Sequence, residues 1–309
     1  MQPRIHFEPS RITLGSAQFG TPYGIANTSG QPSEAEAFAI LDRAVELGVN
    51  TIDTARGYGT SENVIGKWIK SRRPRGIHVV TKVPKIPEGP DAERRNFVRA
   101  QIAASQKSLG VEPLALVLAH VGTDLLDPLI AGEFQSIVTA GDIKGFGASV
   151  YDPATAERLI DTVPIAALQA PASVADRRFE QAGLFAAASN RGIAVFVRSI
   201  FLQGILLIEP ERLPDHLKGL APFLTALAEA ARGSNRSIAA LAITALRDFP
   251  SVTSLILGVD SAEQLATNIE AMKASPVPPA VLSELIGSAS RIPPDILLPT
   301  NWKRLAHSA

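Results

Sequence analysis

The amino-acid sequence predicts an α/β protein, a closed (β/α)8 TIM barrel with extra helices near the C-terminus. Short apolar runs alternate with longer segments of helical periodicity from Ile12 nearly to the end of the 309 residues. This alternation is typical of successive βαβ units, in which helices connect parallel strands. Eight of the apolar runs have the length of strands, and eight parallel strands close a barrel of this kind.

Each predicted strand is followed by a predicted helix, as the barrel requires. The strands are expected at residues 12–17, 50–53, 77–82, 114–119, 143–147, 165–169, 193–197 and 252–257. The helices are expected at residues 33–47, 61–70, 91–109, 127–140, 153–160, 180–190, 221–231 and 262–274. Ser33 is suited to cap the first helix, with Glu36 completing a capping box and Gly48 ending the helix. Residues 238–249 and 279–289 supply the extra helices.

The same repeat bears on domain organisation. It covers most of the chain, and no composition break, Ser/Gly linker or low-complexity tract interrupts it. We therefore expect a single barrel domain over residues 1–309.

Composition narrows the class of protein. Thirty basic and thirty acidic side chains give a net charge of zero, without the positive footprint of a nucleic-acid-binding protein. The absence of cysteine excludes disulfides and thiolate metal sites and favours a cytoplasmic location. The first residues lack the apolar core of a signal peptide, and no run approaches the roughly 18 apolar residues of a membrane span. We expect a cytoplasmic protein with a small-molecule partner.

A polar stretch after the second predicted strand, residues 53–62, is the first candidate for chemistry. It contains Asp53 and Tyr58, five residues apart, where the C-terminal end of a buried strand is expected. In α/β proteins this edge of the sheet houses the active site. Lys82 ends the third predicted strand and His120 directly follows the fourth, at equivalent positions, so the four side chains are expected to meet at the barrel mouth.

These four residues suit proton transfer at neutral pH. The unperturbed pKa of a tyrosine is about 10, and an adjacent ammonium is expected to lower it by stabilising the phenolate. Lys82 would supply that charge, Asp53 would hold Lys82 in place, and His120 would orient a carbonyl oxygen or share in the proton relay. Ser61 and Glu62 are better explained as the cap and the first turn of the next helix.

Taken singly, each residue has a simpler explanation. Tyr58 and Lys82 alone are typical surface or packing residues, and a histidine after an apolar strand is more often structural than catalytic. The motifs of zincins, α/β-hydrolases, phosphate loops and Rossmann folds are absent, and the five histidines are too dispersed for a local metal motif. No metal site is expected, and a dinucleotide would have to be held by barrel loops.

The order and spacing of these residues resemble the aldo-keto reductase superfamily, as a bacterial aldo/keto reductase. The resemblance rests on three segments: Asp53 to Tyr58 followed by Gly-x-Ser-Glu62, then Thr81-Lys82-Val83, then Leu118-Ala-His120. It implies a catalytic tetrad of Asp53, Tyr58, Lys82 and His120. It further implies an NAD(P)(H)-dependent oxidoreductase that interconverts a carbonyl and an alcohol by hydride transfer, with Tyr58 as general acid and base.

Later segments resemble the cofactor site of the same family. The resemblance implies that Ser149 on strand five and Gln169 on strand six orient the nicotinamide. It implies that the segment after strand seven contacts the nicotinamide and pyrophosphate through Arg198, Ser199, Leu202 and Gly204. Strand eight and its helix resemble the adenosine site, with Gly258, Asp260, Gln264 and Asn268. Without the resemblance, the last two would be explained as exposed polar residues one helical turn apart.

Three positions depart from the family pattern. Ser149 is followed by Val150 rather than the usual Asn, and Arg198 stands where strand seven often offers an aromatic ring. A planar guanidinium can also stack on a ring, which keeps a cofactor role for Arg198. Asp260 stands where many members carry Arg, Lys or Ser near the 2′-phosphate. The family favours NADP(H), but an acid there should repel a phosphate, so we hypothesise that NAD(H) is used at least as well.

The substrate depends on variable loops. Residues 20–26 resemble a bacterial branch of the family with sugar-acting members, which favours an aldose or another polar aldehyde, beside simpler aldehydes and ketones. Trp302 would either cap the pocket or anchor the C-terminal tail. Two alternatives stay open: a non-enzymatic, redox-sensing subunit of the same fold, and a barrel aldolase that uses Lys82 as a Schiff base.

Overall fold

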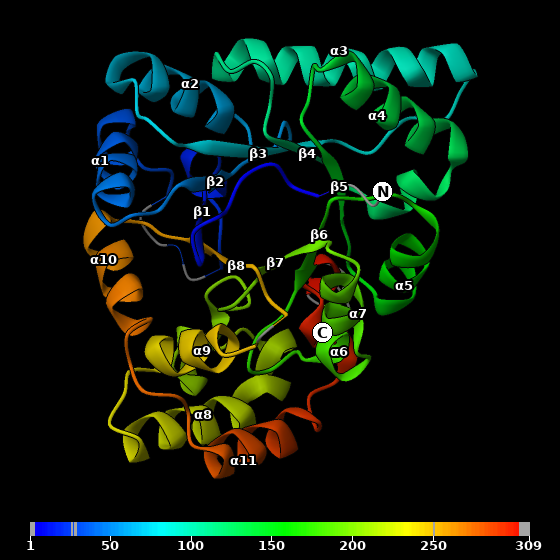
Figure 1. The fold of residues 1–309 in the computed structure, drawn as a ribbon. Coiled ribbons are helices and arrows are strands. Elements are labelled where there is room, and N and C mark those ends of the chain that lie inside the picture. The colour runs from blue at the N-terminus through cyan, green and yellow to red at the C-terminus, as the bar shows by residue number, and fades with distance from the viewer. Residues whose placement is uncertain (1–3, 26, 28–29, 250, 303–309) are drawn as a thin grey trace.

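The computed structural model describes residues 4–25, 27, 30–249 and 251–302 of the chain (Figure 1). Eight strands form a closed parallel barrel, each paired with the next along the chain and the last with the first. They are β1 (Ile12–Gly15), β2 (Thr51–Asp53), β3 (His78–Val83), β4 (Leu116–Ala119), β5 (Phe146–Ser149), β6 (Ala167–Pro171), β7 (Ala194–Arg198) and β8 (Ser254–Gly258). The predicted (β/α)8 TIM barrel is confirmed.

Several strands begin later than the apolar runs that predicted them. The fifth run begins at Ile143, yet Ile143 forms only an isolated bridge with Leu114 before β5 begins. Both side chains are fully buried. An apolar run therefore indicates which residues are buried at the amino end of the barrel. The hydrogen-bonded strand begins later than the run and continues into polar residues at the carboxyl end.

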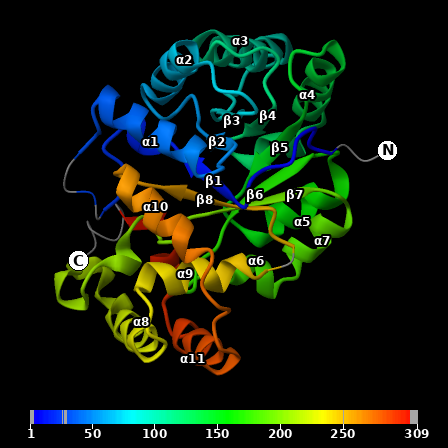
Figure 2. The same ribbon diagram turned by 60° about the vertical axis from the view of Figure 1, so that its left-hand side comes forward.

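The helices surround the barrel, as Figures 1 and 2 show. They are α1 (Glu34–Glu46), α2 (Ser61–Arg72), α3 (Asp91–Leu109), α4 (Pro128–Ala140), α5 (Pro153–Thr162), α6 (Arg178–Gln181), α7 (Leu184–Asn190), α8 (Ala221–Gly233), α9 (Ile238–Arg247), α10 (Ala262–Ala271) and α11 (Pro279–Ala289). The extra helices predicted at 238–249 and 279–289 are confirmed as α9 and α11. The last of these packs against α8.

Local sequence signals explain where helices begin and break. Ser33 caps α1 through a complete capping box with Glu36, as predicted. The prediction of a single helix at 180–190 is wrong. The chain forms two helices, α6 and α7, and Gly183 lies between them with a φ of 70°. Glycine reaches this left-handed conformation at little cost, and it interrupts the helix.

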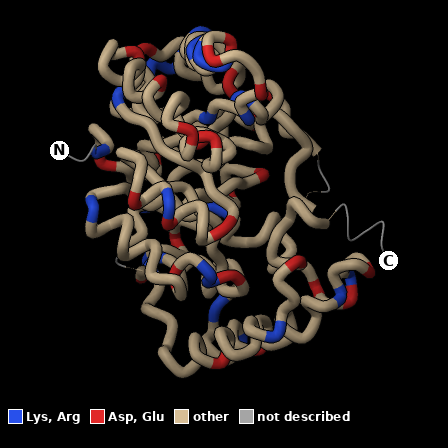
Figure 3. The backbone as a smooth tube through the Cα atoms, turned by 90° about the vertical axis from the view of Figure 1, so that its right-hand side faces the viewer, with Lys and Arg blue, Asp and Glu red and all other residues tan. Residues whose placement is uncertain are grey.

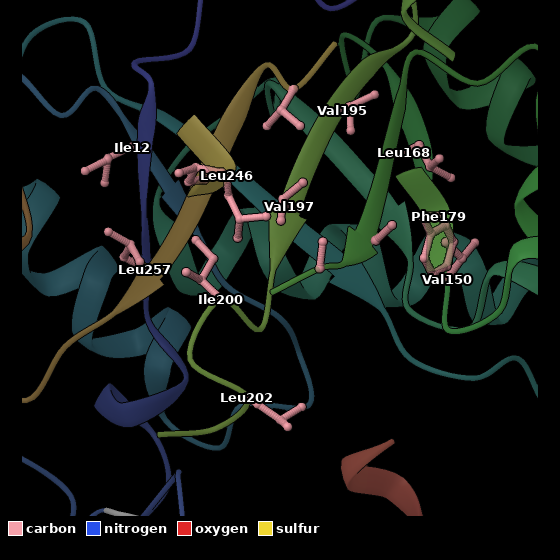
Figure 4. Close-up of a cluster of buried hydrophobic side chains, with 14 of the residues drawn as sticks. Ile12, Val150, Leu168, Phe179, Val195, Val197, Ile200, Leu202, Leu246 and Leu257 are labelled. Atoms are coloured by element: carbon pink, nitrogen blue, oxygen red, sulfur yellow. The ribbon is translucent and has the colours of Figure 1, made fainter. Parts of the chain in front are cut away.

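Two apolar layers support the barrel. The larger lies between strands and helices; Figure 4 shows Val195 and Val197 of β7 and Leu257 of β8 gathered near Leu246 of α9. The smaller fills the barrel interior and consists of Val80, Leu116, Leu118, Ala167, Ala194, Phe196 and Ile256, with Ile5 and Phe7 packed against it.

The smaller apolar layer determines where polar side chains can lie inside the barrel. Successive residues of a strand alternate between its two faces, so positions two apart point the same way. Four polar side chains each follow an interior apolar residue by two positions: Lys82, His120, Gln169 and Arg198. The smaller apolar layer therefore fills the barrel interior up to the carboxyl ends of the strands, where these polar side chains begin.

The surface carries both signs of charge. Lys and Arg positions are interspersed with Asp and Glu positions along the backbone drawn in Figure 3. None of the helices in the described part of the chain combines the length and the hydropathy that a membrane span requires. The same part of the chain holds no group of three or more His, Cys, Asp or Glu side chains placed to bind a metal ion.

Candidate active site

The four residues of the predicted tetrad lie together at the carboxyl end of the barrel. Asp53 ends β2, Lys82 lies in β3, His120 directly follows β4, and Tyr58 lies in the loop between β2 and α2. The strand register explains why they meet. Val80, not Lys82, is the partner of Asp53, so the inward-facing site residue lies two positions further along the next strand. Tilted strands in a closed barrel produce this stagger.

Lys82 is held between Asp53 and Tyr58. Its Nζ donates to Asp53 Oδ2 at 2.6 Å and to the Thr54 carbonyl at 2.9 Å, and it lies 3.4 Å from the Tyr58 hydroxyl. The other carboxylate oxygen of Asp53 accepts a hydrogen bond from Gln169 Nε2 at 2.7 Å. Both charged side chains are buried. Asp53 therefore anchors the ammonium in a fixed position beside the phenol.

His120 packs edge-on against Tyr58, with ring centroids 5.8 Å apart and planes at 87°. Burial lowers the pKa of His120 to about 4, and the charges of Lys82 and Arg198 act in the same direction. The imidazole is consequently neutral at pH 7 and has one N–H to donate. It suits a hydrogen bond to a carbonyl oxygen rather than proton donation as an imidazolium.

The pKa of Tyr58 differs from the sequence-based expectation. Burial raises the pKa of the phenol, the Asp53 carboxylate adds to the increase, and Arg198 opposes it. The expectation of a net decrease caused by Lys82 is wrong, because Asp53 neutralises that ammonium at 2.6 Å and burial of the phenol dominates. Burial likewise lowers the pKa of Lys82, against the attraction of Asp53. Tyr58 is a protonated phenol at neutral pH.

A buried hydroxyl cluster fixes the loop that carries Tyr58. The prediction of Ser61 as a helix cap is wrong, because Thr60 precedes α2 and Ser61 is its first residue. The Ser61 hydroxyl is fully buried and lies 2.8 Å from the Ser16 hydroxyl and 3.0 Å from that of Thr54. It also donates to the Ser16 carbonyl at 2.9 Å. These contacts join the ends of β1 and β2 to the start of α2.

Glu62 forms a second buried link behind Tyr58. One carboxylate oxygen accepts a hydrogen bond from Arg56 Nη1 and the other from the Thr81 hydroxyl, both at 2.6 Å. Glu62 is 2% exposed, so its role extends beyond the first turn of the helix that the sequence suggested. Arg56 lies in the Tyr58 loop and Thr81 precedes Lys82. Glu62 therefore ties the loop to β3.

A cleft opens at the carboxyl end of the barrel and runs past Tyr58. Its walls come from the loop after β1, the end of β2, the segment after β7 and the end of β8 with the start of α10. The predicted site residues in these walls are Asp53, Tyr58, Arg198, Ser199, Gly204, Gly258, Asp260 and Gln264. Others are buried rather than part of the cleft walls: Lys82, Ser149, Gln169, Leu202 and Asn268.

Ser149 and Gln169 lie side by side as register partners at the end of β5 and within β6. Gln169 donates to Asp53 through Nε2, while its Oε1 is buried and has no hydrogen-bond partner in the described structure. An unsatisfied buried acceptor is costly, and most such groups in proteins find a donor. A ligand with an amide N–H would satisfy this oxygen.

Arg198 ends β7 at the wall of the cleft. Its guanidinium donates to the Val150 carbonyl at 2.9 Å and to the Ser199 hydroxyl at 3.2 Å. It also stacks on Tyr151, with Cζ 4.2 Å from the ring centroid. Arg198 separates the cleft from a smaller pocket, which Tyr151 and Leu202 line. The contact with Tyr151 holds the guanidinium plane in place.

The far end of the cleft carries an acid. Asp260 and Gln264 both line it, and the backbone N–H of Asp260 donates to Gln264 Oε1 at 2.7 Å. Partial burial raises the pKa of Asp260, which forms no ion pair among the described residues. Asn268 lies further along α10 and is 4% exposed. This end of the cleft therefore presents a hydrogen-bond acceptor that has no cationic partner among the described residues.

Two aromatic residues complete the description. Tyr23 lines the cleft with Tyr58 but received no site role from the sequence, although it lies in the stretch 20–26. Ala26 of that stretch lies outside the described residues. Trp302 is buried and donates through Nε1 to the Ile296 carbonyl at 2.8 Å. Of the two roles considered for Trp302, anchoring the tail is the one observed.

At the mouth of the parallel barrel, a lysine, a carboxylate and a phenol pack together beside a cleft. The profile of the Aldo/keto reductase family matches residues 11–286, and the chain belongs to this family. Family membership makes the protein an oxidoreductase that interconverts carbonyls and alcohols. It also indicates a nicotinamide cofactor.

Known proteins resemble the chain at moderate identity. Aldo-keto reductase str7 of Strobilurus tenacellus is 31% identical over 204 residues, which cover 63% of this chain and 58% of that protein. D-threo-aldose 1-dehydrogenase of a Pseudomonas species is 28% identical over 329 residues, covering 90% and 96%. The holo form of aldo-keto reductase AKR11C1 from Bacillus halodurans has the same fold, with a TM-score of 0.72, 22% identity, and 94% and 95% of the two chains covered.

Proposed function

We propose that this enzyme transfers a hydride reversibly between C4 of a nicotinamide and a carbonyl carbon, with Tyr58 exchanging the proton of the oxygen. The observation that carries the proposal is the position of the Lys82 ammonium, bound to Asp53 and next to the Tyr58 hydroxyl. In reduction, Tyr58 donates its proton as negative charge develops on the carbonyl oxygen, and Lys82 stabilises the phenolate left behind. The neutral imidazole of His120 donates a hydrogen bond that orients the carbonyl.

The residues around the cleft fit a nicotinamide dinucleotide. The unsatisfied Oε1 of Gln169 would accept from the carboxamide, beside Ser149, and Arg198 would stack on the ring. The remaining contacts would come from Ser199 and Gly204 along the pyrophosphate and from Gly258, Asp260 and Gln264 around the adenosine. Leu202 and Asn268 are buried and would support these segments from behind the cleft wall. When bound, the cofactor supplies or accepts the hydride. The protein positions the carbonyl group next to Tyr58 and excludes water from the site.

Asp260 supports the use of NAD(H) at least as well as NADP(H). Its carboxylate lines the far end of the cleft without a cationic partner among the described residues. It would accept a hydrogen bond from a free ribose hydroxyl and repel a 2′-phosphate. A preference for NADPH of about a hundredfold or more would contradict this assignment.

The substrate we propose is a small aldehyde, ketone or aldose. One relative, aligned over 90% of this chain and 96% of its own length, is named for an aldose. The loop after β1 also brings Tyr23 into the cleft as a polar group beside Tyr58. A Schiff-base aldolase is disfavoured by Lys82 itself. The amine has no exposed surface and is surrounded by oxygens of Asp53, Thr54 and Tyr58, which leaves no approach for a carbonyl carbon.

A substrate screen tests the proposed function. Aldoses, aldehydes and ketones are each offered with NADH and with NADPH, and the absorbance of the reduced nicotinamide is followed. We expect carbonyl-dependent oxidation of the cofactor, with NADH at least as effective as NADPH. Covalent trapping of a carbonyl compound by borohydride without any cofactor turnover would instead favour the aldolase.

A further inference from the structure

Arg198 places a positive charge without an acidic partner at the end of the cleft that contains Tyr58. Its guanidinium donates to the Val150 carbonyl and the Ser199 hydroxyl, which are both uncharged, and it forms no salt bridge within the described part of the chain. Asp176, the carboxylate that lines the neighbouring pocket, is bound by Arg178 at 2.8 Å. The charge of Arg198 is thus free to act on the cleft.

The other titratable groups at this end contribute little net charge. Lys82 and Asp53 neutralise each other in their buried ion pair. His120 is neutral because its pKa lies at about 4, and Tyr58 is protonated because its pKa is raised. Arg198 therefore supplies the net positive charge at this end of the cleft.

Arg198 borders both the smaller pocket and the main cleft. Tyr151 covers one face and belongs to the smaller pocket. Arg198 also lines the main cleft, which Tyr151 does not. Arg198 thus borders the cleft that contains Tyr58, and we take the guanidinium face that Tyr151 leaves uncovered as the surface on which a nicotinamide ring would stack.

We propose that Arg198 makes this site discriminate between the two redox states of the nicotinamide, binding the reduced form more tightly than the oxidised form. The inference rests on the proposed function, because it takes the cleft to be the nicotinamide site. The oxidised ring carries a positive charge and the reduced ring is neutral, so a stacked guanidinium repels only the oxidised ring. An aromatic residue at this position would stack on both forms without that repulsion. Arg198 thus promotes release of the oxidised cofactor after carbonyl reduction.

Dissociation constants measured by isothermal titration calorimetry test this inference without relying on turnover. They are determined for NADH, NAD+, NADPH and NADP+ with the wild type, Arg198→Met and Arg198→Lys. For NAD and for NADP separately, the dissociation constant of the oxidised form is divided by that of the reduced form. The adenosine contacts and any contribution of the 2′-phosphate are common to both forms and cancel in this ratio. We expect a wild-type ratio above one, and a ratio reduced about fivefold or more in Arg198→Met.

The lysine variant separates charge from shape. Arg198→Lys keeps the charge but loses the plane, so it should weaken both forms while largely preserving the ratio. Arg158→Met, at an exposed arginine of α5, is the matched control and should keep the wild-type ratio. An unchanged ratio in a folded Arg198→Met overturns the inference. A wild-type ratio at or below one overturns it independently of any variant, and a wild type that binds no cofactor form overturns the proposed function as well.

Discussion

The Lys82 ammonium lies 2.6 Å from the Asp53 carboxylate, at the centre of the site and out of contact with solvent. Neither charge would be stable here alone, because burying an unpaired charge is costly. The same ammonium lies 3.4 Å from the Tyr58 hydroxyl, where it can stabilise a phenolate. One ion pair therefore supports both the fold and the proposed chemistry, and mutations can separate the two roles.

Replacing Lys82 with Met should lower stability and abolish turnover. The variant leaves the Asp53 carboxylate buried without its cation, at a cost of about 3 kcal/mol in the free energy of unfolding. The double variant Asp53→Asn/Lys82→Met removes both charges and should regain most of that free energy while remaining inactive. Urea denaturation and kcat are measured for each variant. Turnover that returns together with stability would contradict the catalytic role of Lys82.

The raised pKa of Tyr58 predicts opposite pH dependences for the two directions of reaction. Reduction needs the protonated phenol, which is present through neutral pH and lost only as the pH rises through the raised pKa. Oxidation needs the phenolate, so its kcat should rise about tenfold per pH unit from roughly pH 7 to 9. Profiles of kcat against pH in both directions check this. An oxidation rate already level below about pH 8 would mean that the phenol ionises more readily than the site geometry implies.

The lowered pKa of His120 predicts folding that is sensitive to acid. The imidazole of the unfolded chain takes up a proton near its ordinary pKa of 6.5, but that of the folded chain only near 4. The unfolded state therefore binds more protons in this window, and stability is lost as the pH falls through it. His120→Asn should reduce this loss by roughly 2–3 kcal/mol. Denaturation of both proteins across the window provides the comparison, and identical losses would exclude a buried neutral imidazole.

Glu62 should affect turnover through the position of Tyr58 and Lys82 rather than through contact with substrate. Glu62→Gln weakens the ion pair with Arg56 behind the loop, and we expect a decrease in kcat of about tenfold with little change in KM. The matched control is Glu133→Gln on α4, which removes an equally buried carboxylate that pairs with Arg95 and Arg99. Both variants should lose stability, but only Glu62→Gln should lose turnover. If Glu62→Gln and Glu133→Gln had the same kcat, Glu62 would have only a structural role.

The sequence predicted the barrel and the meeting of four polar side chains at its mouth because both depend on local patterns. Alternating apolar runs identify strands, and Asp53, Lys82 and His120 each stand where an apolar run gives way to polar residues. The exact strand ends were less predictable, since apolar character at Ile143 reports burial and not ladder pairing. Gly183 was an available signal for the break between α6 and α7.

Properties that depend on several distant segments could not be predicted from the sequence. Ser61 meets Ser16 only because β1 and α2 are neighbours in space, so its hydroxyl looked like a cap. The pKa of Tyr58 depends on how fully the barrel mouth encloses the phenol and on the neutralisation of Lys82, and neither is visible in residue spacing. The stacking of Arg198 on Tyr151 joins the ends of β5 and β7 and could not be inferred from either segment alone.

The most direct test of the proposed mechanism compares Tyr58→Phe with the wild type. The substitution removes one hydroxyl and keeps the ring that packs against His120 and Lys82. Single-turnover and steady-state rates are measured with the best carbonyl substrate of the screen, and cofactor dissociation constants are measured in parallel. If Tyr58 is the proton donor, turnover falls about a hundredfold or more while cofactor binding stays nearly intact. Turnover equal to that of the wild type would contradict the proposed mechanism.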